Sequence, residues 1–141
     1  MDSLQRFLDA QAPVYAQACA ELKAGEKQSH WMWFIFPQLR GLGQSATAVH
    51  YGIASRQEAL DYLRHPVLGA RLRHCMVLLL GHRGLSAQAI FGDIDAMKLK
   101  SCATLFAAIA GQEPVFQQVL DHYYSGARDG RTLELLQLQG P

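Results

Sequence analysis

Apolar residues recur along this chain at steps of three and four, and this spacing restricts the fold more than any other feature. It places side chains on one stripe of a helix, whereas a half-buried strand would alternate apolar and polar residues. The first stripe comprises Leu4, Phe7, Leu8, Gln11, Tyr15, Ala18 and Leu22. Pro13 interrupts it, so we expect a short helix that ends near Ala12. A second helix should run from Pro13 to Ala24, with Gly25 closing it.

Start and stop signals divide the middle of the chain. Ser55 and Glu58 have the spacing of a capping box, in which the two side chains satisfy amides of the first helical turn. We expect a helix from Ser55 to His65, because Pro66 follows. The buried stripe of the next helix consists of Leu68, Leu72, Cys75, Met76 and Leu79, before the stop at Gly81.

Two further helices are predicted near the end of the chain. Pro114 suits a first helical turn, and the apolar face that follows it consists of Val115, Phe116, Val119, Leu120, Tyr123 and Tyr124. Asp129 can cap a last helix, which should carry Leu133 and Leu136 inward.

The run from Trp31 to Phe36 is ambiguous, because a short aromatic and branched stretch suits a buried strand or a helix that is apolar all round. A strand needs a partner, and no second alternating segment is convincing. We therefore predict a buried helix from Ser29 to Phe36, ended by Pro37. The whole chain, residues 1–141, is expected to form an all-α, single-domain bundle of about six to eight short to medium helices.

Composition narrows the functional classes. Half of the 141 residues are hydrophobic, which is enough for a core, and the formal charge of +1 without a basic block indicates no general affinity for DNA. The three cysteines are far apart and fit neither a disulfide framework nor a zinc site. No leader, membrane span, paired metal histidines, Walker loop or nucleophile elbow is recognisable. We expect a cytoplasmic protein without a metal site.

The first chemically unusual segment extends from Lys27 to Gln38 and combines two tryptophans with a histidine and several polar groups. Aromatic walls with a few fixed polar groups are typical of a small-molecule pocket. The alternative is a core segment in which His30 and Gln38 satisfy the backbone at helix ends. In a helix, His30 and Trp33 would share a face, with Trp31 about a hundred degrees round. We therefore expect one tryptophan, Trp33, beside His30 in a pocket, Trp31 mainly in the core, and Gln38 turned back toward the cavity.

The second unusual segment extends from Ile90 to Ser101. Asp95 has the character of a helix N-cap, and that structural role can account for it. Lys98 and Ser101 lie three residues apart, so they would share a helix face and could hold an anion such as phosphate near the helix start.

These segments together resemble the bacterial family known as Domain of Unknown Function 1810, some members of which carry a calpastatin label. The resemblance extends from about Leu4 to Leu136. The motifs that carry it are Lys27-x-Ser29-His30-Trp31-Met32-Trp33-Phe34-Ile35-Phe36-Pro37-Gln38, Gly41-Leu42-Gly43, Tyr51-Gly52-Ile53, Tyr62-Leu63 to His65-Pro66, Leu68-Gly69 to Arg71-Leu72, and Ile90-Phe91-Gly92 to Asp95 with Lys98-Leu99. One departure is Cys102, which stands where many relatives carry methionine.

The resemblance implies an all-helical, stand-alone cytoplasmic protein with a loose link to nucleotide metabolism that involves NAD or ADP-ribose. It transfers no established catalytic residues. The family motif is matched at His30, Trp31, Trp33, Gln38, Tyr51, Asp95 and Lys98.

Two functional hypotheses follow. In the first, the protein binds, and could modify, a small phosphorylated or nucleotide-like ligand, with His30 as the candidate general acid or base. The ligand-binding candidates are Lys27, Trp33, Gln38, Tyr51, Asp95, Lys98 and Ser101. In the second, a non-catalytic interaction domain meets RNA or an acidic protein through a basic face made of Arg64, Arg71, Arg73, His74, His82 and Arg83. The sequence identifies no cofactor.

Overall fold

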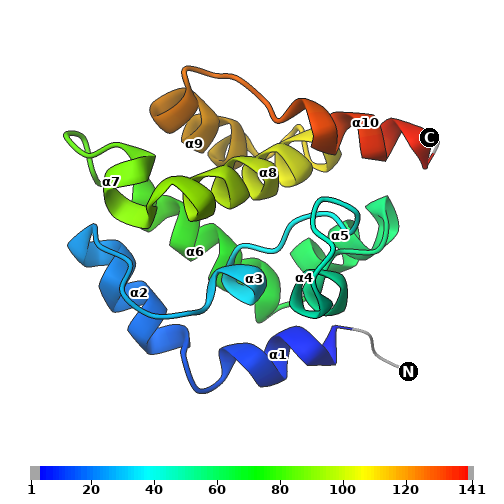
Figure 1. Ribbon diagram of the computed structural model, residues 1–141, viewed down its shortest axis with the longest axis horizontal. Coiled ribbons are helices and arrows are strands. Elements are labelled where there is room, and N and C mark those ends of the chain that lie inside the picture. Colours follow the sequence, from blue (N-terminus) through cyan, green and yellow to red (C-terminus); the bar gives the residue numbers. More distant parts are fainter. Residues whose placement is uncertain (1–3, 140–141) are drawn as a thin grey trace.

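Ten helices form within residues 4–139, the part of the chain that this computed structural model describes (Figure 1). They are α1 (Gln5–Gln11), α2 (Tyr15–Ala24), α3 (Met32–Ile35), α4 (Ala46–Tyr51), α5 (Arg56–Arg64), α6 (Leu68–Leu80), α7 (Ala87–Phe91), α8 (Asp93–Ile109), α9 (Pro114–Tyr124) and α10 (Gly130–Leu138). The expected all-α class is confirmed. There are more helices than the six to eight expected, because the short helices α4 and α7 were not foreseen. Their serine caps, Ser45 and Ser86, accept hydrogen bonds from amides of the first turn.

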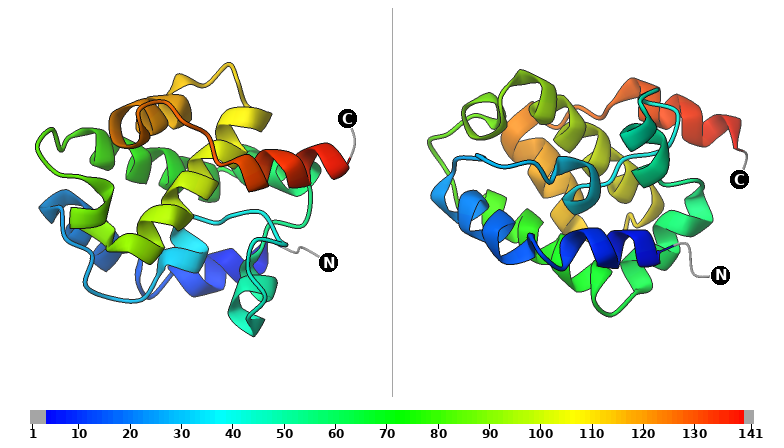
Figure 2. Two further views of the ribbon diagram at one scale, coloured as in Figure 1. Left: turned by 45° about the horizontal axis from the view of Figure 1, so that its top comes forward. Right: turned by 60° about the horizontal axis from the view of Figure 1, so that its bottom comes forward.

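The longest helix, α8, occupies the centre of the fold, and α5, α7, α9 and α10 pack against it (Figure 1). Every residue of α8 from Ser101 to Ala107 is buried. On the other side of the core, α6 contacts α2, α5 and α9, while α1 lies along α3 (Figure 2). A helix that is apolar on all sides can only be stable when neighbours surround it, which explains the central place of α8. Its first turns are more polar and carry Asp93, Asp95, Lys98 and Lys100.

Most local start and stop signals are confirmed. Gly25 ends α2 in the left-handed conformation, with φ of 77°, and Pro114 occupies the first turn of α9. Ser55 caps α5 by accepting a hydrogen bond from Glu58 N at 3.1 Å, and the helix ends at His65. Asp129 caps α10 by accepting from Thr132 N at 2.9 Å. Each of these signals acts within a few residues, so tertiary packing did not override it.

Three details of these helices differ from the prediction. The helix α2 begins at Tyr15 and not at Pro13. The Glu58 carboxylate accepts from the amide of Ala54 instead of that of the cap residue, and it also pairs with Arg6 at 2.8 Å. Leu136 is buried as expected, but Leu133 is 36% exposed. In α10 only one edge of the helix reaches the core, so a residue three positions away from Leu136 remains at the surface.

The tryptophan segment, residues 27–38, is helical only over the four residues of α3. A helix is confirmed in preference to a strand, but the expected bounds of Ser29–Phe36 are wrong. Contacts with other parts of the molecule hold the backbone before Trp31 in an irregular conformation. At the other end, the chain leaves the helical conformation at Phe36, with ψ of 73°, and continues to Pro37. His30 and Trp31 therefore precede the helix and do not follow its face geometry.

After Pro37 the chain pairs briefly with the segment that precedes α5. Leu39 and Ile53 form an isolated parallel bridge, in which Ile53 N donates to Gln38 O at 2.9 Å and Arg40 N donates to Ile53 O at 2.8 Å. The approach requires a glycine next to the bridge, because a Cβ on Gly52 would lie 2.8 Å from the Cα of Arg40. This bridge fixes the backbone of Gln38.

None of the helices in residues 4–139 has the length and apolar character needed to cross a membrane. The cysteines Cys19, Cys75 and Cys102 carry free thiols.

Candidate functional site

A buried carboxylate holds the tryptophan segment from behind. Glu21 of α2 is 4% exposed and accepts hydrogen bonds from the amides of Gln28 and Ser29, at 2.8 and 3.0 Å, and from the Ser29 hydroxyl. The indole nitrogen of Trp31 donates to the same carboxylate at 2.9 Å, and Gln17 donates at 2.8 Å. Glu21 thus fixes the segment through neutral donors from four residues.

The pKa of Glu21 reflects these contacts. Burial alone would raise it, but the hydrogen bonds from Ser29, Gln28 and Gln17 stabilise the ionised form and lower the pKa from 4.5 to about 2. Glu21 is therefore charged at neutral pH, although it is buried. Glu21 is not among the candidate residues predicted from the sequence. The available signal was an acid on the inner face of α2, three residues after the buried Ala18.

A second anchor lies on the far side of α3. The side-chain amide of Gln11 donates to Phe34 O at 2.7 Å and to the Tyr62 hydroxyl at 2.9 Å. Gln11 is 1% exposed, so this contact is sealed from water. The two anchors fix α3 at its start and at its middle, which leaves little freedom to the side chains on its outer surface.

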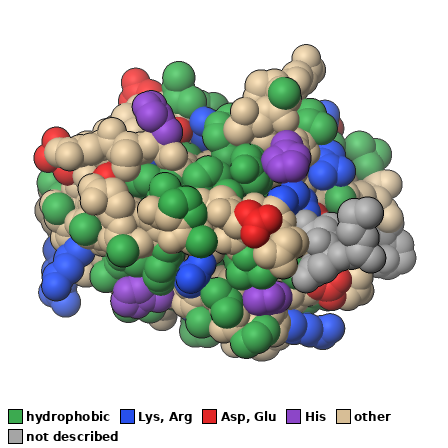
Figure 3. All heavy atoms as spheres, turned by 90° about the horizontal axis from the view of Figure 1, so that it is seen from below, with side chains coloured by type: hydrophobic (Ala, Val, Ile, Leu, Met, Phe, Trp, Pro, Cys, Tyr) green, Lys and Arg blue, Asp and Glu red, His purple; other side chains and the backbone are tan. Residues whose placement is uncertain are grey.

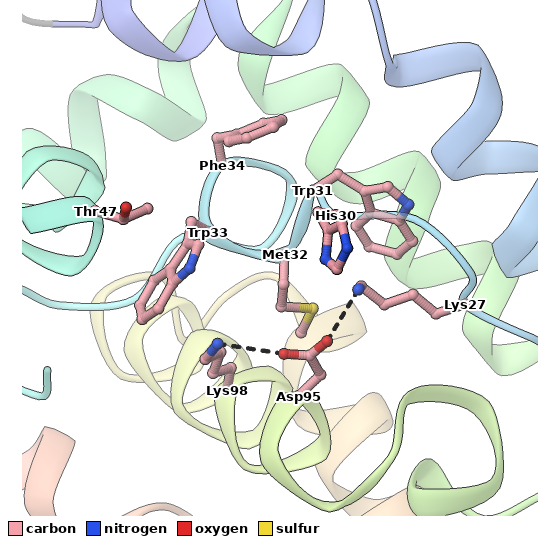
Figure 4. Close-up of a pocket in the computed structure, with 9 residues that line it drawn as sticks. All are labelled: Lys27, His30, Trp31, Met32, Trp33, Phe34, Thr47, Asp95 and Lys98. Atoms are coloured by element: carbon pink, nitrogen blue, oxygen red, sulfur yellow. Dashed lines mark ion pairs between the residues drawn. The ribbon is translucent and has the colours of Figure 1, made fainter. Parts of the chain in front are cut away.

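In front of the segment lies a cavity of about 310 Å³, here called the first cavity (Figure 4). Its lining residues are Lys27, His30, Trp31, Met32, Trp33, Phe34, Thr47, Asp95 and Lys98. Figure 4 shows Lys27, His30 and Trp33 reaching from the tryptophan segment toward Asp95 and Lys98 on α8. Residues about seventy positions apart in the sequence are thereby brought to one opening.

Asp95 lies between two ammonium groups in this cavity. Lys27 Nζ is 2.9 Å from one carboxylate oxygen and Lys98 Nζ is 3.3 Å from the other (Figure 4). Lys27 also donates to Ser29 O at 2.7 Å. The ammonium of Lys98 lies 3.9 Å from the ring centroid of Trp33, within the range of a cation–π contact. The ammonium groups of Lys27 and Lys98, the carboxylate of Asp95 and the indole of Trp33 thus lie next to one another.

The expected N-cap role of Asp95 is wrong. The helix α8 begins two residues earlier, at Asp93, because Gly92 turns the chain with φ of 80°. Asp95 therefore lies inside the first turn. Its negative charge there interacts favourably with the positive end of the helix dipole, but its carboxylate accepts no hydrogen bond from a backbone amide of the described residues. Its partners are the two lysines.

A neighbouring cavity of about 350 Å³, the second cavity, shares Trp33 and Lys98 with the first. Its lining residues are Trp33, Gln38, Leu42, Gly43, Ile94, Met97, Lys98, Ser101, Asp129 and Arg131. Trp33 and Lys98 thus form the wall between the two cavities. Most of the second cavity is apolar, with polar groups at Gln38, Ser101 and its outer rim.

The candidate residues divide between the two cavities. Lys27, His30 and Asp95 line the first cavity, and Gln38 and Ser101 line the second. Trp33 on α3 and Lys98 on α8 line both. Tyr51 lines neither, because its ring packs against those of Phe34 and Phe7, with centroids 5.2 and 6.1 Å away. The lining residues Met32, Phe34 and Thr47 were missed, and their types gave no chemical signal.

The two tryptophans differ as predicted in burial, since Trp31 is 1% exposed and Trp33 is half-buried. The expectation that only one of them borders the first cavity is wrong, because an edge of Trp31 also lines it. His30 is exposed at the mouth of this cavity, and its ring has no hydrogen-bond partner within residues 4–139.

Half of the basic face predicted on α5, α6 and the following turn is engaged within the fold, while Arg64, His74 and Arg83 are exposed. Arg73 makes two hydrogen bonds to Glu113, Arg71 lies 4.6 Å from the ring centroid of Tyr15, and His82 contacts Leu22 O. The face of the molecule in Figure 3 likewise shows basic side chains interspersed with acidic and hydrophobic ones. Among residues 4–139 there is also no group of His, Cys, Asp and Glu side chains suited to a metal ion.

Comparison with known proteins places this arrangement in a family. Residues 1–136 match the family described as protein of unknown function DUF1810. The chain belongs to that family. It is also similar to a solved structure, that of the conserved hypothetical protein Rv1873 from Mycobacterium tuberculosis, with 51% sequence identity and a TM-score of 0.93 over 95% of this chain and 96% of that one. No protein of curated function matches this DUF1810 chain.

Proposed function

We propose that the protein binds a small phosphorylated, nucleotide-like ligand across the first and second cavities. The observation that carries the proposal is the position of Lys98, whose ammonium lies 3.9 Å from the ring centroid of Trp33 in the wall that both cavities share. A cation and an indole are presented together at an opening. Phosphate and a heteroaromatic ring are the two groups that such a pair attracts.

The charges of the first cavity favour an anion. Lys27 and Lys98 contribute two positive charges against the single negative charge of Asp95. An ammonium group has three donors, and neither lysine uses all three on contacts within the described residues. Because Asp95 holds both ammonium groups in place, a phosphate can accept from them with little loss of side-chain entropy.

The indole of Trp33 supplies the aromatic half of the proposal. It is half-buried and borders both cavities, whereas Trp31 is committed to the core and to Glu21. Stacking of a base on an aromatic side chain contributes about 1–3 kcal/mol in nucleic-acid complexes. A ring on Trp33 and a phosphate on the lysines together suit a nucleotide.

The second part of the proposal concerns chemistry at His30. Its imidazole borders the same cavity, is exposed, and has no partner within residues 4–139. An imidazole has one nitrogen that can accept a proton and one that can donate it, so at this position it could exchange a proton with a bound ligand. NAD and ADP-ribose are the ligands that the family resemblance suggests, and both carry the required phosphates and rings.

A panel of ligands tests the binding proposal. Inorganic phosphate, adenosine 5′-monophosphate, ADP, NAD and ADP-ribose should be tested by thermal shift and then by calorimetry. We expect at least one nucleotide to raise the melting temperature, because a ligand at 100 times its Kd stabilises the fold by about 2.7 kcal/mol. A panel in which no compound shifts the melting temperature of the wild-type protein would refute the proposal.

Matched variants connect such binding to the site. Lys98→Met removes the ammonium on Trp33 and should abolish the shift. Lys100→Met is the control, since Lys100 lies two residues further along α8 and lines neither cavity. Equal loss in both variants would show that binding is non-specific. His30→Ala should keep binding and remove any turnover of the bound ligand.

A further inference from the structure

The side chain of Gln38 is largely buried, and its amide makes no hydrogen bond with the described residues, 4–139. The residue is 9% exposed and lines the second cavity. Neither of its amide atoms is among the fully enclosed side-chain atoms that lack a partner, so the amide is open to water at the cavity, and a ligand can replace that water. The amide of Gln38 thus faces the cavity as an available donor and acceptor.

The backbone of Gln38 is fixed, so its side chain starts from a defined position. Pro37 precedes it, and its carbonyl accepts from Ile53 N at 2.9 Å. The next residue, Leu39, forms the parallel bridge with Ile53. A side chain on such a support is organised before any ligand arrives, which reduces the entropy lost on binding.

The surroundings of Gln38 suit a flat ring. Trp33 forms one side of the second cavity, and Leu42 and Met97 add apolar surface. Ser101 is 8% exposed and donates its hydroxyl proton to Met97 O at 3.2 Å, so its oxygen is available only as an acceptor. A planar group that enters here meets these apolar walls, the amide of Gln38 and the hydroxyl of Ser101, and the charged residues Lys98, Asp129 and Arg131 complete the lining.

We infer that the second cavity binds the base of the nucleotide, and that Gln38 selects a base with a hydrogen-bond donor and acceptor side by side, of which adenine is the model. A glutamine amide matches such an edge with two parallel hydrogen bonds, as it does with the N6 and N7 positions of adenine. The inference rests on the proposed function and assigns the ligand's orientation. Its ring lies in the second cavity and its phosphate lies in the first, with Lys98 between them.

Three probes test the inference on the wild-type protein. Adenosine 5′-monophosphate has the required edge. Purine riboside 5′-monophosphate has the same ring system, sugar and phosphate but lacks the 6-amino donor, and ribose 5-phosphate lacks the ring. Because a bidentate pair discriminates by about 10- to 100-fold, we expect the first probe to bind that much more tightly than the second. Calorimetry measures the ratio.

A substitution then tests whether Gln38 causes the difference in affinity between the two purine nucleotides. Gln38→Met keeps the length of the side chain without its amide, so it should bring the two purine nucleotides to nearly equal affinity and leave ribose 5-phosphate unchanged. Gln44→Met is the matched control, because Gln44 is exposed and lines neither cavity. It should keep the wild-type ratio.

The outcomes separate this inference from the proposed function. Equal affinity of the wild-type protein for the two purine nucleotides, or a ratio that survives Gln38→Met, would overturn the inference while phosphate binding and the proposed function stand. Failure of all three probes to bind the wild-type protein would overturn the inference, and the proposed function would fall with it only if ADP, NAD and ADP-ribose also failed to bind. If Gln38→Met does not fold, the ratio of the two purine-nucleotide affinities, measured on the wild-type protein, decides the inference by itself.

Discussion

Two carboxylates lie on opposite sides of the tryptophan segment, and their surroundings differ. Glu21, behind the segment, is 4% exposed and is surrounded by neutral donors from Gln17, Gln28, Ser29 and Trp31. Asp95, in front of it, has a side chain that is 20% exposed, and its partners are two ammonium groups at the edge of a cavity. One carboxylate is sealed within the fold, whereas the other lies at an opening.

The difference separates a carboxylate that serves structure from one that we propose takes part in binding. The donors to Glu21 are backbone amides and groups that the fold already fixes, so the contact is complete without any ligand. The donors to Asp95 are ammonium groups that reach a cavity and still have unused hydrogens. We expect changes behind the segment to reduce stability and changes in front of it to affect binding.

The largest expected effect comes from removing Trp31. Trp31→Ala deletes a fully buried side chain and one donor to Glu21, and it should lower the free energy of unfolding by about 3–5 kcal/mol. Trp33→Ala removes a half-buried ring and should cost about 1 kcal/mol, with loss of nucleotide binding. Urea denaturation of both variants measures the contrast. Equal, large losses from both would show that the segment is purely structural.

Acid should reveal the contribution of Glu21. Its pKa in the fold is lowered from 4.5 to about 2, so its stabilisation is complete above pH 4.5 and is lost as pH falls toward 2. The shift corresponds to about 3 kcal/mol. Glu21→Gln cannot titrate there, so its stability should fall less steeply between pH 4.5 and 2. Parallel acid profiles of urea midpoints for the two proteins would contradict this assignment.

Gly52→Ala should disturb the front of the segment and leave the back unchanged. The added Cβ would lie 2.8 Å from Arg40 Cα, so the bridge that positions Gln38 must shift, at a cost of about 1–3 kcal/mol. Discrimination between the two purine nucleotides should weaken. Gly84→Ala is the control, because a Cβ there meets no atom within 4 Å. The prediction fails if both variants keep wild-type stability and wild-type discrimination.

The smallest effect on stability is expected from Asp95→Asn. Partly exposed ion pairs contribute little, so the free energy of unfolding should fall by about 1 kcal/mol or less. The same change removes the negative charge that competes with a ligand for Lys27 and Lys98. Calorimetry should therefore show tighter binding of phosphorylated ligands to the variant. Weaker binding would show that the hold of Asp95 on the two lysines has a larger effect than its competition with the ligand for them.

These contrasts also show what the sequence could predict. Helix ends at Gly25, Ser55 and Pro114 depend on residues within one turn, and all three were predicted correctly. Asp95 was misassigned because two residues compete to begin a helix there, and the left-handed Gly92 starts it earlier. Local preference could rank Asp95 as a cap but could not show that Lys27 would reach it from another element.

The sequence predicted which residues lie at the candidate site better than it predicted their positions relative to one another. The ion-paired lysines and the indole were chosen for their chemistry, and the fold brings them together. The separation of Gln38 from His30 into different cavities depends on where Pro37 sends the chain and on the bridge to Ile53, which are tertiary facts. Tyr51 was selected because it matched the family motif, and its packing against Phe34 explains it without a ligand.

The unequal burial of the two tryptophans gives the molecule a built-in optical reporter. Trp31 is enclosed, so its emission should be blue-shifted and should resist quenching by acrylamide. Trp33, half-buried with a cation on its face, should emit further to the red and be open to the quencher. Because these are the only two tryptophans in the sequence, the fluorescence spectrum divides into one signal for the integrity of the fold and another for the occupancy of the cavities.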